Sequence, residues 1–248
     1  MVIAKLIFYI MRKFILLLLL TIPSLALAID LEGYYITAKG GVSKTLSAGV
    51  THDRSHTGAY AVQKNEDLGK DSAFGLSAGK YLSDNFRLEL EATKRTGYEY
   101  DVGYFTSPQL NLKANIETHA LFINGFYDFQ PFSINNTPIT HYLGGGLGFS
   151  RNKMGTSHQT RFGQRSGASI EGHTMNQFAY KLSAGTLVSL IEQVSLDVNY
   201  QYINLGAFKG GSTLTLNGVV YPNFTKGKGA NGGVIKSHEL MVGLQYKF

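Results

Sequence analysis

Ionisable residues alternate with apolar ones along parts of this chain, and this spacing determines which charged groups can act together. Arg87, Glu89 and Glu91 stand two positions apart, separated by Leu88 and Leu90. Residues two apart on an extended strand share one face. A strand here would therefore carry acids and bases on one side and hydrocarbon on the other, where the charged groups can hold ions or neutralise one another.

Residue types that catalyse reactions are not productively spaced. The chain has no cysteine, which removes thiol nucleophiles, disulfides and cysteine-based zinc sites. A deacylase-like relay on one strand needs a Ser two positions after a His, and no His in the sequence has one. Ser237, His238 and Glu239 are consecutive, so a strand would splay them to opposite faces. We expect no catalytic residue.

A histidine pair and a glycine run resemble ligand-binding motifs, but both are better explained without a ligand. His52 and His56 are four apart, as on a metal-binding helix, but Gly, Ser and Thr around them favour a loop and no zinc-protease motif accompanies them. The run from Gly144 to Gly148 lacks the Gly-Lys-Ser/Thr of a phosphate loop, so close packing or strand curvature explains it better. We expect neither metal nor cofactor.

The N-terminus has the layout of a secretory signal peptide. Basic Lys5, Arg12 and Lys13 precede an apolar block, and small residues end at Ala28. The apolar block is shorter than the roughly 20 residues of a spanning helix. We predict that residues 1–28 are cleaved and that 29–248 form one domain; a retained N-terminal anchor is the alternative.

The remainder of the chain is organised as strands of about nine or more residues, long enough to cross a bilayer when tilted. Period-two alternation is clearest from Val194 and from Phe86 onward, and no apolar run of 18 residues follows the signal segment. The predicted strands are Tyr34–Lys44, Ala73–Leu82, Phe86–Asp101, Ile116–Phe129, Ile139–Arg151, Gln177–Leu190, Val194–Leu205 and Lys236–Phe248.

The connections between these strands alternate between short and long. Tight turns occupy 83–85 and 191–193, with a somewhat longer turn at 130–138, whereas the other connections are predicted as long loops. The long loops are Thr45–Ser72, Val102–Asn115, Asn152–Asn176 and Gly206–Ile235. Short periplasmic turns and long external loops are typical of outer-membrane barrels. We predict an all-β fold, an eight-stranded antiparallel transmembrane β-barrel with four long extracellular loops.

Aromatic residues and short motifs agree with this prediction. The 15 Tyr and 15 Phe residues gather near strand ends, as in the aromatic girdles of barrels. Segments 120–129, 142–149, 178–185 and 194–202, with the closing segment from Leu240 to Phe248, resemble the opacity-type, OmpA-like family of eight-stranded outer-membrane barrels, which includes surface antigens of rickettsia-like bacteria. The resemblance implies that Phe248 is the aromatic recognised by the outer-membrane assembly machinery, and it brings no catalytic set.

Assigning the apolar faces to lipid places a set of charges inside the barrel. They are Lys39, Arg87, Glu89, Glu91, Lys181, Asp197, Glu239 and Lys247. An eight-stranded interior is just wide enough to be filled by side chains, and buried charges persist when paired. We hypothesise that Arg87 and Lys181 neutralise some of the acids and plug the barrel. A small passive pore remains the alternative.

The third and fourth long loops are basic, although the whole chain is only mildly so. The net charge of +6 falls to +3 without the three basic residues of the signal segment, too little to argue for nucleic-acid binding. Against Glu171 alone stand Arg151, Lys153, Arg161, Arg165, Lys209, Lys226, Lys228 and Lys236. Such a rim attracts anionic surfaces, for which lipopolysaccharide phosphates and anionic host glycans or proteins are candidates.

We therefore expect an outer-membrane surface antigen or adhesin-like protein that acts through its external loops and contributes to envelope integrity. The passive pore is the competing function, and a lipid-modifying barrel enzyme is the less favoured one.

Overall fold

The computed structural model describes residues 31–46, 48–49, 67–104, 107–223 and 232–248. Gly33 to Lys247 form one compact unit. The expected signal peptide therefore lies outside the described residues, as do His52 and His56. Over the described ranges, no helix has the length and hydropathy needed to cross a bilayer.

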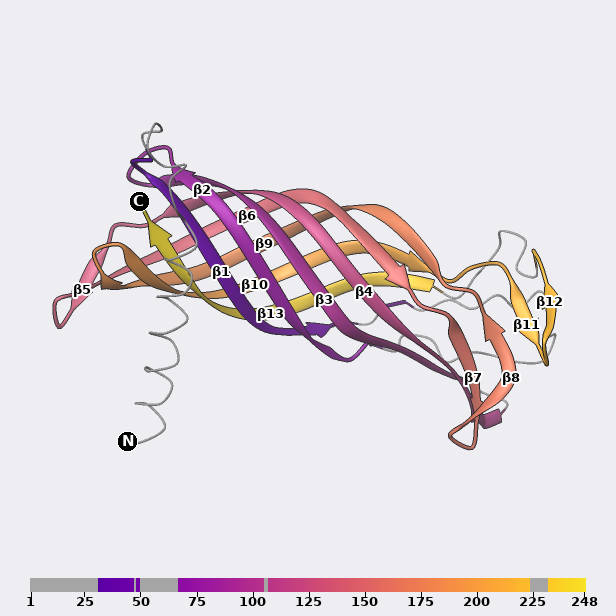
Figure 1. Cartoon of the computed structure of the whole chain (residues 1–248). Coiled ribbons are helices and arrows are strands. Elements are labelled where there is room, and N and C mark those ends of the chain that lie inside the picture. Colours follow the sequence, from indigo (N-terminus) through magenta and orange to yellow (C-terminus); the bar gives the residue numbers. More distant parts are fainter. Residues whose placement is uncertain (1–30, 47, 50–66, 105–106, 224–231) are drawn as a thin grey trace, which may run out of the picture. The chain divides into compact units, whose positions relative to one another are not determined.

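Eight antiparallel strands close into a barrel (Figure 1). Each strand pairs with the next, β1 pairs with β13, and pairing between β4 and β6 completes the ring. The strands are β1 (Tyr34–Thr45), β2 (Lys70–Tyr81), β3 (Phe86–Tyr104), β4 (Ser107–Asp128), β6 (Thr137–Met154), β9 (His173–Ile191), β10 (Val194–Lys209) and β13 (Gly232–Lys247). The predicted eight-stranded barrel is confirmed.

Five short strands lie outside the ring. β5 (Phe132–Ile134) pairs with the start of β6 at the end of the barrel that carries the short turns. At the opposite end, the sheet continues from β4 through β7 (Ser157–Arg161), β8 (Gln164–Ile170), β11 (Leu214–Leu216) and β12 (Val219–Tyr221). Figure 1 shows this extension projecting beyond the barrel. We call these two ends the short-turn end and the long-connection end.

The predicted long loop Val102–Asn115 is wrong. β3 runs to Tyr104 and β4 begins at Ser107, so most of that segment is paired strand. In the part of this segment on β4 the alternation has the opposite sense, because the apolar Leu112 and Ala114 point inward while Lys113 is exposed. The predicted loop Asn152–Asn176 contains β7 and β8, and Gly206–Ile235 contains β11 and β12. Most of Thr45–Ser72 lies outside the described residues.

Side chains of the barrel wall alternate between interior and exterior. Glu89 and Glu91 are 4% and 0% exposed, whereas Leu88 and Leu90 expose 48% and 52% of their surface. Transferring a complete leucine side chain from water to an apolar environment is favourable by about 1.5–3 kcal/mol, so a wall of half-exposed leucines would be unfavourable in water. The outer wall of the barrel therefore requires an apolar surrounding.

The glycine run of β6 makes room for interior side chains. A Cβ on Gly144 would collide with the ring of Phe126, and one on Gly146 with the amide of Asn124. The glycines lie within the strand, paired to β4 and β9. These close contacts agree with the close packing that the sequence predicts for the glycine run.

Candidate functional sites in the lumen and at the barrel ends

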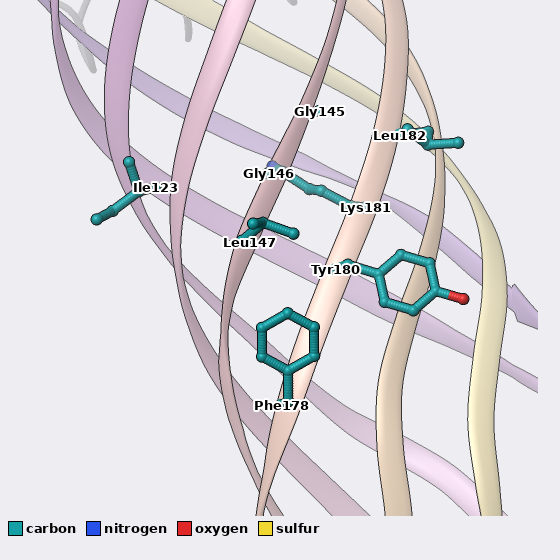
Figure 2. A pocket seen from close by; sticks show the side chains of 8 residues that line it. All are labelled: Ile123, Gly145, Gly146, Leu147, Phe178, Tyr180, Lys181 and Leu182. Carbon is teal, nitrogen blue, oxygen red and sulfur yellow. The ribbon is translucent and has the colours of Figure 1, made fainter.

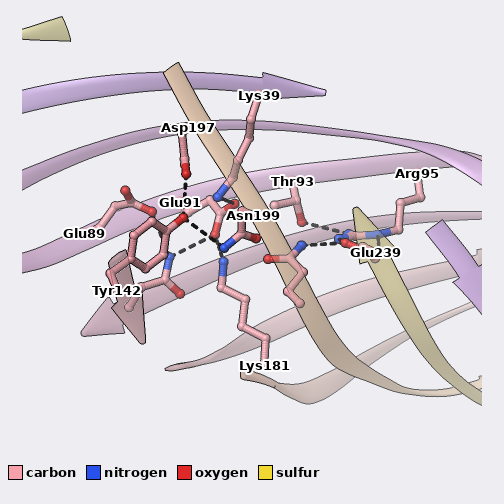
Figure 3. Close-up of polar contacts among 12 residues, drawn as sticks. Lys39, Glu89, Glu91, Thr93, Arg95, Tyr142, Lys181, Asp197, Asn199 and Glu239 are labelled. Atoms are coloured by element: carbon pink, nitrogen blue, oxygen red, sulfur yellow. Dashed lines mark hydrogen bonds and ion pairs between the residues drawn. The ribbon is translucent and has the colours of Figure 1, made fainter. Parts of the chain in front are cut away.

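The centre of the lumen holds one carboxylate between two lysines (Figure 3). Lys39 of β1 lies with its Nζ 2.7 Å from Oε1 of Glu91, and Lys181 of β9 forms an ion pair with the other oxygen. The amide of Asn124 donates to Glu89 at 3.0 Å and to Glu91 at 2.9 Å. Side chains from four strands therefore meet across the middle of the barrel.

A chain of hydrogen bonds flanks this cluster. The hydroxyl of Tyr142 donates to Oδ1 of Asp197 at 2.6 Å and accepts a hydrogen bond of 3.0 Å from Asn199. All three side chains are buried. Asp197, one of the predicted interior acids, is thus held by a phenol.

A second ion pair lies nearer the long-connection end. Arg95 donates from Nε and Nη2 to the two oxygens of Glu239, at 2.6 and 2.7 Å, and from Nη1 to Thr93 at 2.9 Å. Gln201 donates to the same carboxylate at 2.6 Å. Arg95 is 0% exposed, and the sequence analysis missed it. Arg95 lies an even number of residues from Arg87, Glu89 and Glu91 on the predicted strand, so the same alternation places it on the inward face.

Arg87 has a different partner from those predicted. Its Nε donates to Asp128 at 3.0 Å, and its guanidinium lies 4.4 Å from the ring centres of both Phe126 and Tyr142. Arg87 is opposite Phe126 across the β3–β4 ladder, which places Asp128 diagonally beside it. Lys181 pairs with Glu91, one of the predicted acids, whereas the ion pair of Arg87 is with Asp128, which is not among them. The buried position of Arg87 inside the barrel agrees with the expectation.

Lys247 does not join the interior charges. It is exposed at the end of β13, with Nζ 4.8 Å from the ring centre of Tyr81. The alternation assigned it to the lumen, but the strand has reached the barrel rim at this residue. Phe248 follows it directly, and the role of Phe248 in assembly stays a prediction.

At the long-connection end the interior is apolar. Buried side chains of six barrel strands and of neighbouring segments form one cluster. Its members are Ala48, Leu68, Tyr98, Tyr100, Leu112, Ala114, Ile116, Ala120, Phe122, Met154, Ile170, Ala179, Ile203, Leu205, Phe208 and Ile235. The hydroxyl groups of Tyr98 and Ser43 lie 2.5 Å apart, where this apolar core meets the polar lumen.

The predicted basic patch is dispersed. Arg151 and Lys153 are exposed on the outer face of β6, and Arg165 is exposed on β8. Lys209 and Lys236 are half-buried on β10 and β13. The backbone of Arg161 lies in β7, whereas Lys226 and Lys228 are outside the described residues. The described members therefore do not form one compact patch.

The β11–β12 hairpin carries exposed apolar side chains. Val219, Val220 and Tyr221 expose 54%, 59% and 44% of their surface, and Leu216 is exposed as well. We call these four residues the apolar tip. β12 is the last strand in the sheet order, so its outer edge has no strand partner among the described residues.

The Ser237-His238-Glu239 segment is divided by the barrel wall. Ser237 and Glu239 are buried inside. The ring of His238 stacks outside on Tyr200, whose hydroxyl lies 2.6 Å from Nδ1. These three side chains therefore cannot act as a triad.

A shallow hollow marks the outer wall beside the glycine run (Figure 2). It measures about 390 Å³ and is lined mainly by apolar groups of β4, β6 and β9. The lining residues are Ile123, Gly145, Gly146, Leu147, Phe178, Tyr180, Lys181 and Leu182.

A closed antiparallel barrel with a charged, filled interior and an apolar exterior defines the class of transmembrane β-barrels. Residues 14–248 match the family model of the outer membrane protein beta-barrel domain, and the chain belongs to that family. The protein is therefore located in the outer membrane. By the usual topology of such barrels, the long-connection end is extracellular and the short-turn end periplasmic.

Several named proteins are similar to this chain. Outer membrane protein PagN of Salmonella typhimurium is 28% identical over 188 residues, which cover 71% of this chain and 75% of PagN. A Rickettsia prowazekii protein named "Putative adhesin RP828" is 26% identical over 233 residues, 90% of each chain. These relatives are named as outer-membrane or adhesin proteins.

Solved structures share the fold. Neisserial surface protein A superposes with a TM-score of 0.51 at 18% identity, covering 88% of this chain and 98% of that one. OprG of Pseudomonas aeruginosa gives a TM-score of 0.53 at 17% identity, with 88% and 96% covered. At this identity the likeness concerns the fold alone.

Proposed function

We propose that this protein is a non-enzymatic surface adhesin that binds its partner through the extracellular extension formed by β7, β8, β11 and β12. The observation that carries the proposal is the apolar tip. Outside the bilayer these four side chains face water, and exposed apolar patches on a soluble surface commonly mark interaction sites. A Rickettsia relative of nearly equal span is named as an adhesin, which supports the same function.

The edge of β12 supplies a second means of binding. An extended segment of a partner protein can add to an unpaired strand edge through backbone hydrogen bonds. Arg165, exposed on β8 of the same extension, adds positive charge that attracts anionic host glycans or proteins. The barrel anchors this surface in the envelope and contributes to envelope integrity.

The adhesion of bacteria displaying the protein tests the proposal. Replacing Val219, Val220 and Tyr221 with Ser removes the apolar tip. Replacing Phe132 and Ile134 with Ser is a matched control, because these side chains are also exposed on a short hairpin but at the periplasmic end. We expect adhesion to cultured host cells to fall at least tenfold for the tip variant and to stay unchanged for the control, at equal surface display. Equal adhesion of the tip variant and the parent would refute the proposal.

The basic residues can be tested separately with the same assay. Replacing Arg161, Arg165, Lys226 and Lys228 with Gln removes the charges expected to attract glycans. Loss of binding to heparin-like polymers, with the apolar tip intact, would assign the glycan contact to these loops. Unchanged binding would exclude a glycan contact through them.

We also propose that the lumen does not conduct. The Lys39–Glu91–Lys181 cluster crosses the middle of the barrel, and the apolar core lies across its extracellular end. Purified protein inserted in planar bilayers is expected to give no stable channels. Regular single-barrel conductance steps would favour the passive pore instead.

A further inference from the structure

The outer wall of the barrel has two different borders at its extracellular end. On β1, β3, β4 and β6 the outward apolar series ends directly at a basic residue, respectively Lys44, Lys94, His119 and Arg151. On β2 the outward Ser72 separates the apolar series from Lys70. On β9, β10 and β13 the apolar series ends among rings instead, with Tyr180, Tyr200, Tyr202 and His238 in contact with one another. We call the first border the basic arc.

The strand register makes the basic arc continuous in two stretches. Lys44 is directly opposite Lys70 on β2 and His238 on β13. His119 is directly opposite Lys94 on β3 and Arg151 on β6. Side chains opposite one another on a sheet have Cβ atoms about 4.5–5.5 Å apart. Lys44 and Lys70 are like charges and repel each other at this distance. Lys94 and Arg151 lie on either side of His119, so positive charge in both stretches favours a nearby counter-anion.

One acid lies within the arc. Glu117 lies 3.1 Å from Lys94 and 3.6 Å from His119. Lys153, two residues beyond Arg151 on the same face of β6, lies directly opposite Glu117 on β4. Neither Arg151 nor Lys153 forms an ion pair with a described residue, and Glu117 is paired with Lys94 instead. The β6 end of the arc therefore presents positive charge to the surrounding membrane interface.

The hollow of Figure 2 lies on the same outward face, further into the membrane. Along β6 the outward residues run from Gly145 through Leu147 and Phe149 to Arg151 and Lys153. At about 3.3 Å per residue, Arg151 is roughly 20 Å along the strand from Gly145. An apolar depression below a cationic border matches a molecule with an anionic head and a hydrocarbon tail.

We propose that the outer faces of β4, β6 and β9 form a binding site for a phosphorylated lipid of the outer leaflet. The phosphate lies against Arg151, Lys153 and His119, and one acyl chain lies in the hollow beside Gly145. This site is independent of the apolar tip, because it faces the bilayer and not the external medium. The sequence predicts Arg151 and Lys153 as part of a basic loop rim, whereas both lie on the outer face of β6.

Native mass spectrometry of the full folded chain tests this site with two probes, bis-phosphorylated lipid A and the same lipid without phosphates. The arc variant replaces His119, Arg151 and Lys153 with Gln. The control variant replaces Lys80, Lys113 and Lys247 with Gln, which removes three lysine charges from exposed positions outside the arc. The arc variant removes one lysine, one arginine and one histidine, so the control loses at least as much positive charge. Heat-modifiable gel mobility verifies folding of every variant.

We expect the parent and the control to retain the phosphorylated lipid at least tenfold more than the dephosphorylated one, and the arc variant to lose this preference. Equal retention of both lipids by the parent, or an unchanged preference in the arc variant, would overturn the proposal.

A further variant distinguishes a lipid from free phosphate. Gly125 lies opposite Gly145 across β4 and β6, and an added Cβ there meets nothing within 4 Å. Gly125→Leu therefore fills the space beside the hollow without crowding the barrel. It is expected to weaken retention of lipid A severalfold and to leave competition by inorganic phosphate unaltered. Unchanged lipid retention in this variant would contradict the placement of the acyl chain.

Discussion

The interior of the barrel is polar along its membrane-spanning part and apolar at its extracellular end, and the same strands build both regions. On β3, Arg87 and Glu91 point inward and Leu88 outward; further along, Tyr98 and Tyr100 point inward and Glu99 outward. The hydrophobic pattern thus inverts within one strand. The outer wall faces hydrocarbon in the first part and water in the second. The first part therefore buries charged side chains, and the second part buries apolar ones.

The inversion coincides with an irregularity of the sheet. The β3–β4 register shifts between Arg95 and Tyr98, and the buried carboxylate of Asp71 accepts a hydrogen bond of 2.6 Å from the amide of Gly97. A bulge adds a residue to one strand and locally disrupts the ladder. Here it separates the last interior charge of β3 from the first aromatic side chain of the apolar core.

The largest effect is expected from breaking an interior ion pair. Glu239→Gln leaves the buried Arg95 guanidinium without its carboxylate, which should lower the free energy of unfolding by about 3–5 kcal/mol. Urea titration of the protein folded in lipid vesicles measures this change.

The double variant Arg95→Met with Glu239→Gln is the control for that prediction. It removes the charge as well as its partner, so its loss should be clearly smaller than the sum of the two single losses. Additive losses would mean that the pair has no coupling and that the polar lumen does not depend on pairing.

A smaller effect should separate the apolar core from the lipid-facing wall. Ile203→Val removes one methylene group from a fully buried side chain of the core and should cost about 0.5–1.5 kcal/mol. Ile123→Val removes the same group from a side chain that is 61% exposed on the outer wall, where lipid fills the space. Its loss in the same titration should be less than half as large. A greater loss for Ile123→Val would contradict the assignment of inside and outside.

The sequence predicted the barrel because its main signal is local. Alternation from Phe86 and from Val194 and the order of short and long connections each follow from the chain alone. The interior positions of Lys39, Glu91, Lys181 and Glu239 also follow from parity.

The partners of these charges are set by register between distant strands, which parity does not give. Arg95 and Glu239 are 144 residues apart, and Arg87 meets Asp128 only through the β3–β4 ladder. The ends of β3 and β4 were missed for another reason. An outward apolar face indicates a membrane-spanning strand, but beyond the membrane the outward face of β3 and β4 is polar.

The smallest effect is expected outside the membrane, on the water-facing side of the inverted region. Lys113 of β4 lies 2.5 Å from Asp101 of β3, and both side chains are more than one-third exposed. A hydrogen bond to the Asp101 carboxylate, together with its charge, holds the pKa of Lys113 above its ordinary value. Because the folded-state pKa is raised, the stabilisation is fully present at neutral pH and is lost as the pH rises past the ordinary value of lysine. Solvent screening limits it, so Lys113→Gln should cost less than about 1 kcal/mol at pH 7. The difference between the parent and this variant should vanish in strongly alkaline titrations. A loss as large as that of Glu239→Gln would contradict the assignment of the Lys113–Asp101 pair to the water-facing surface.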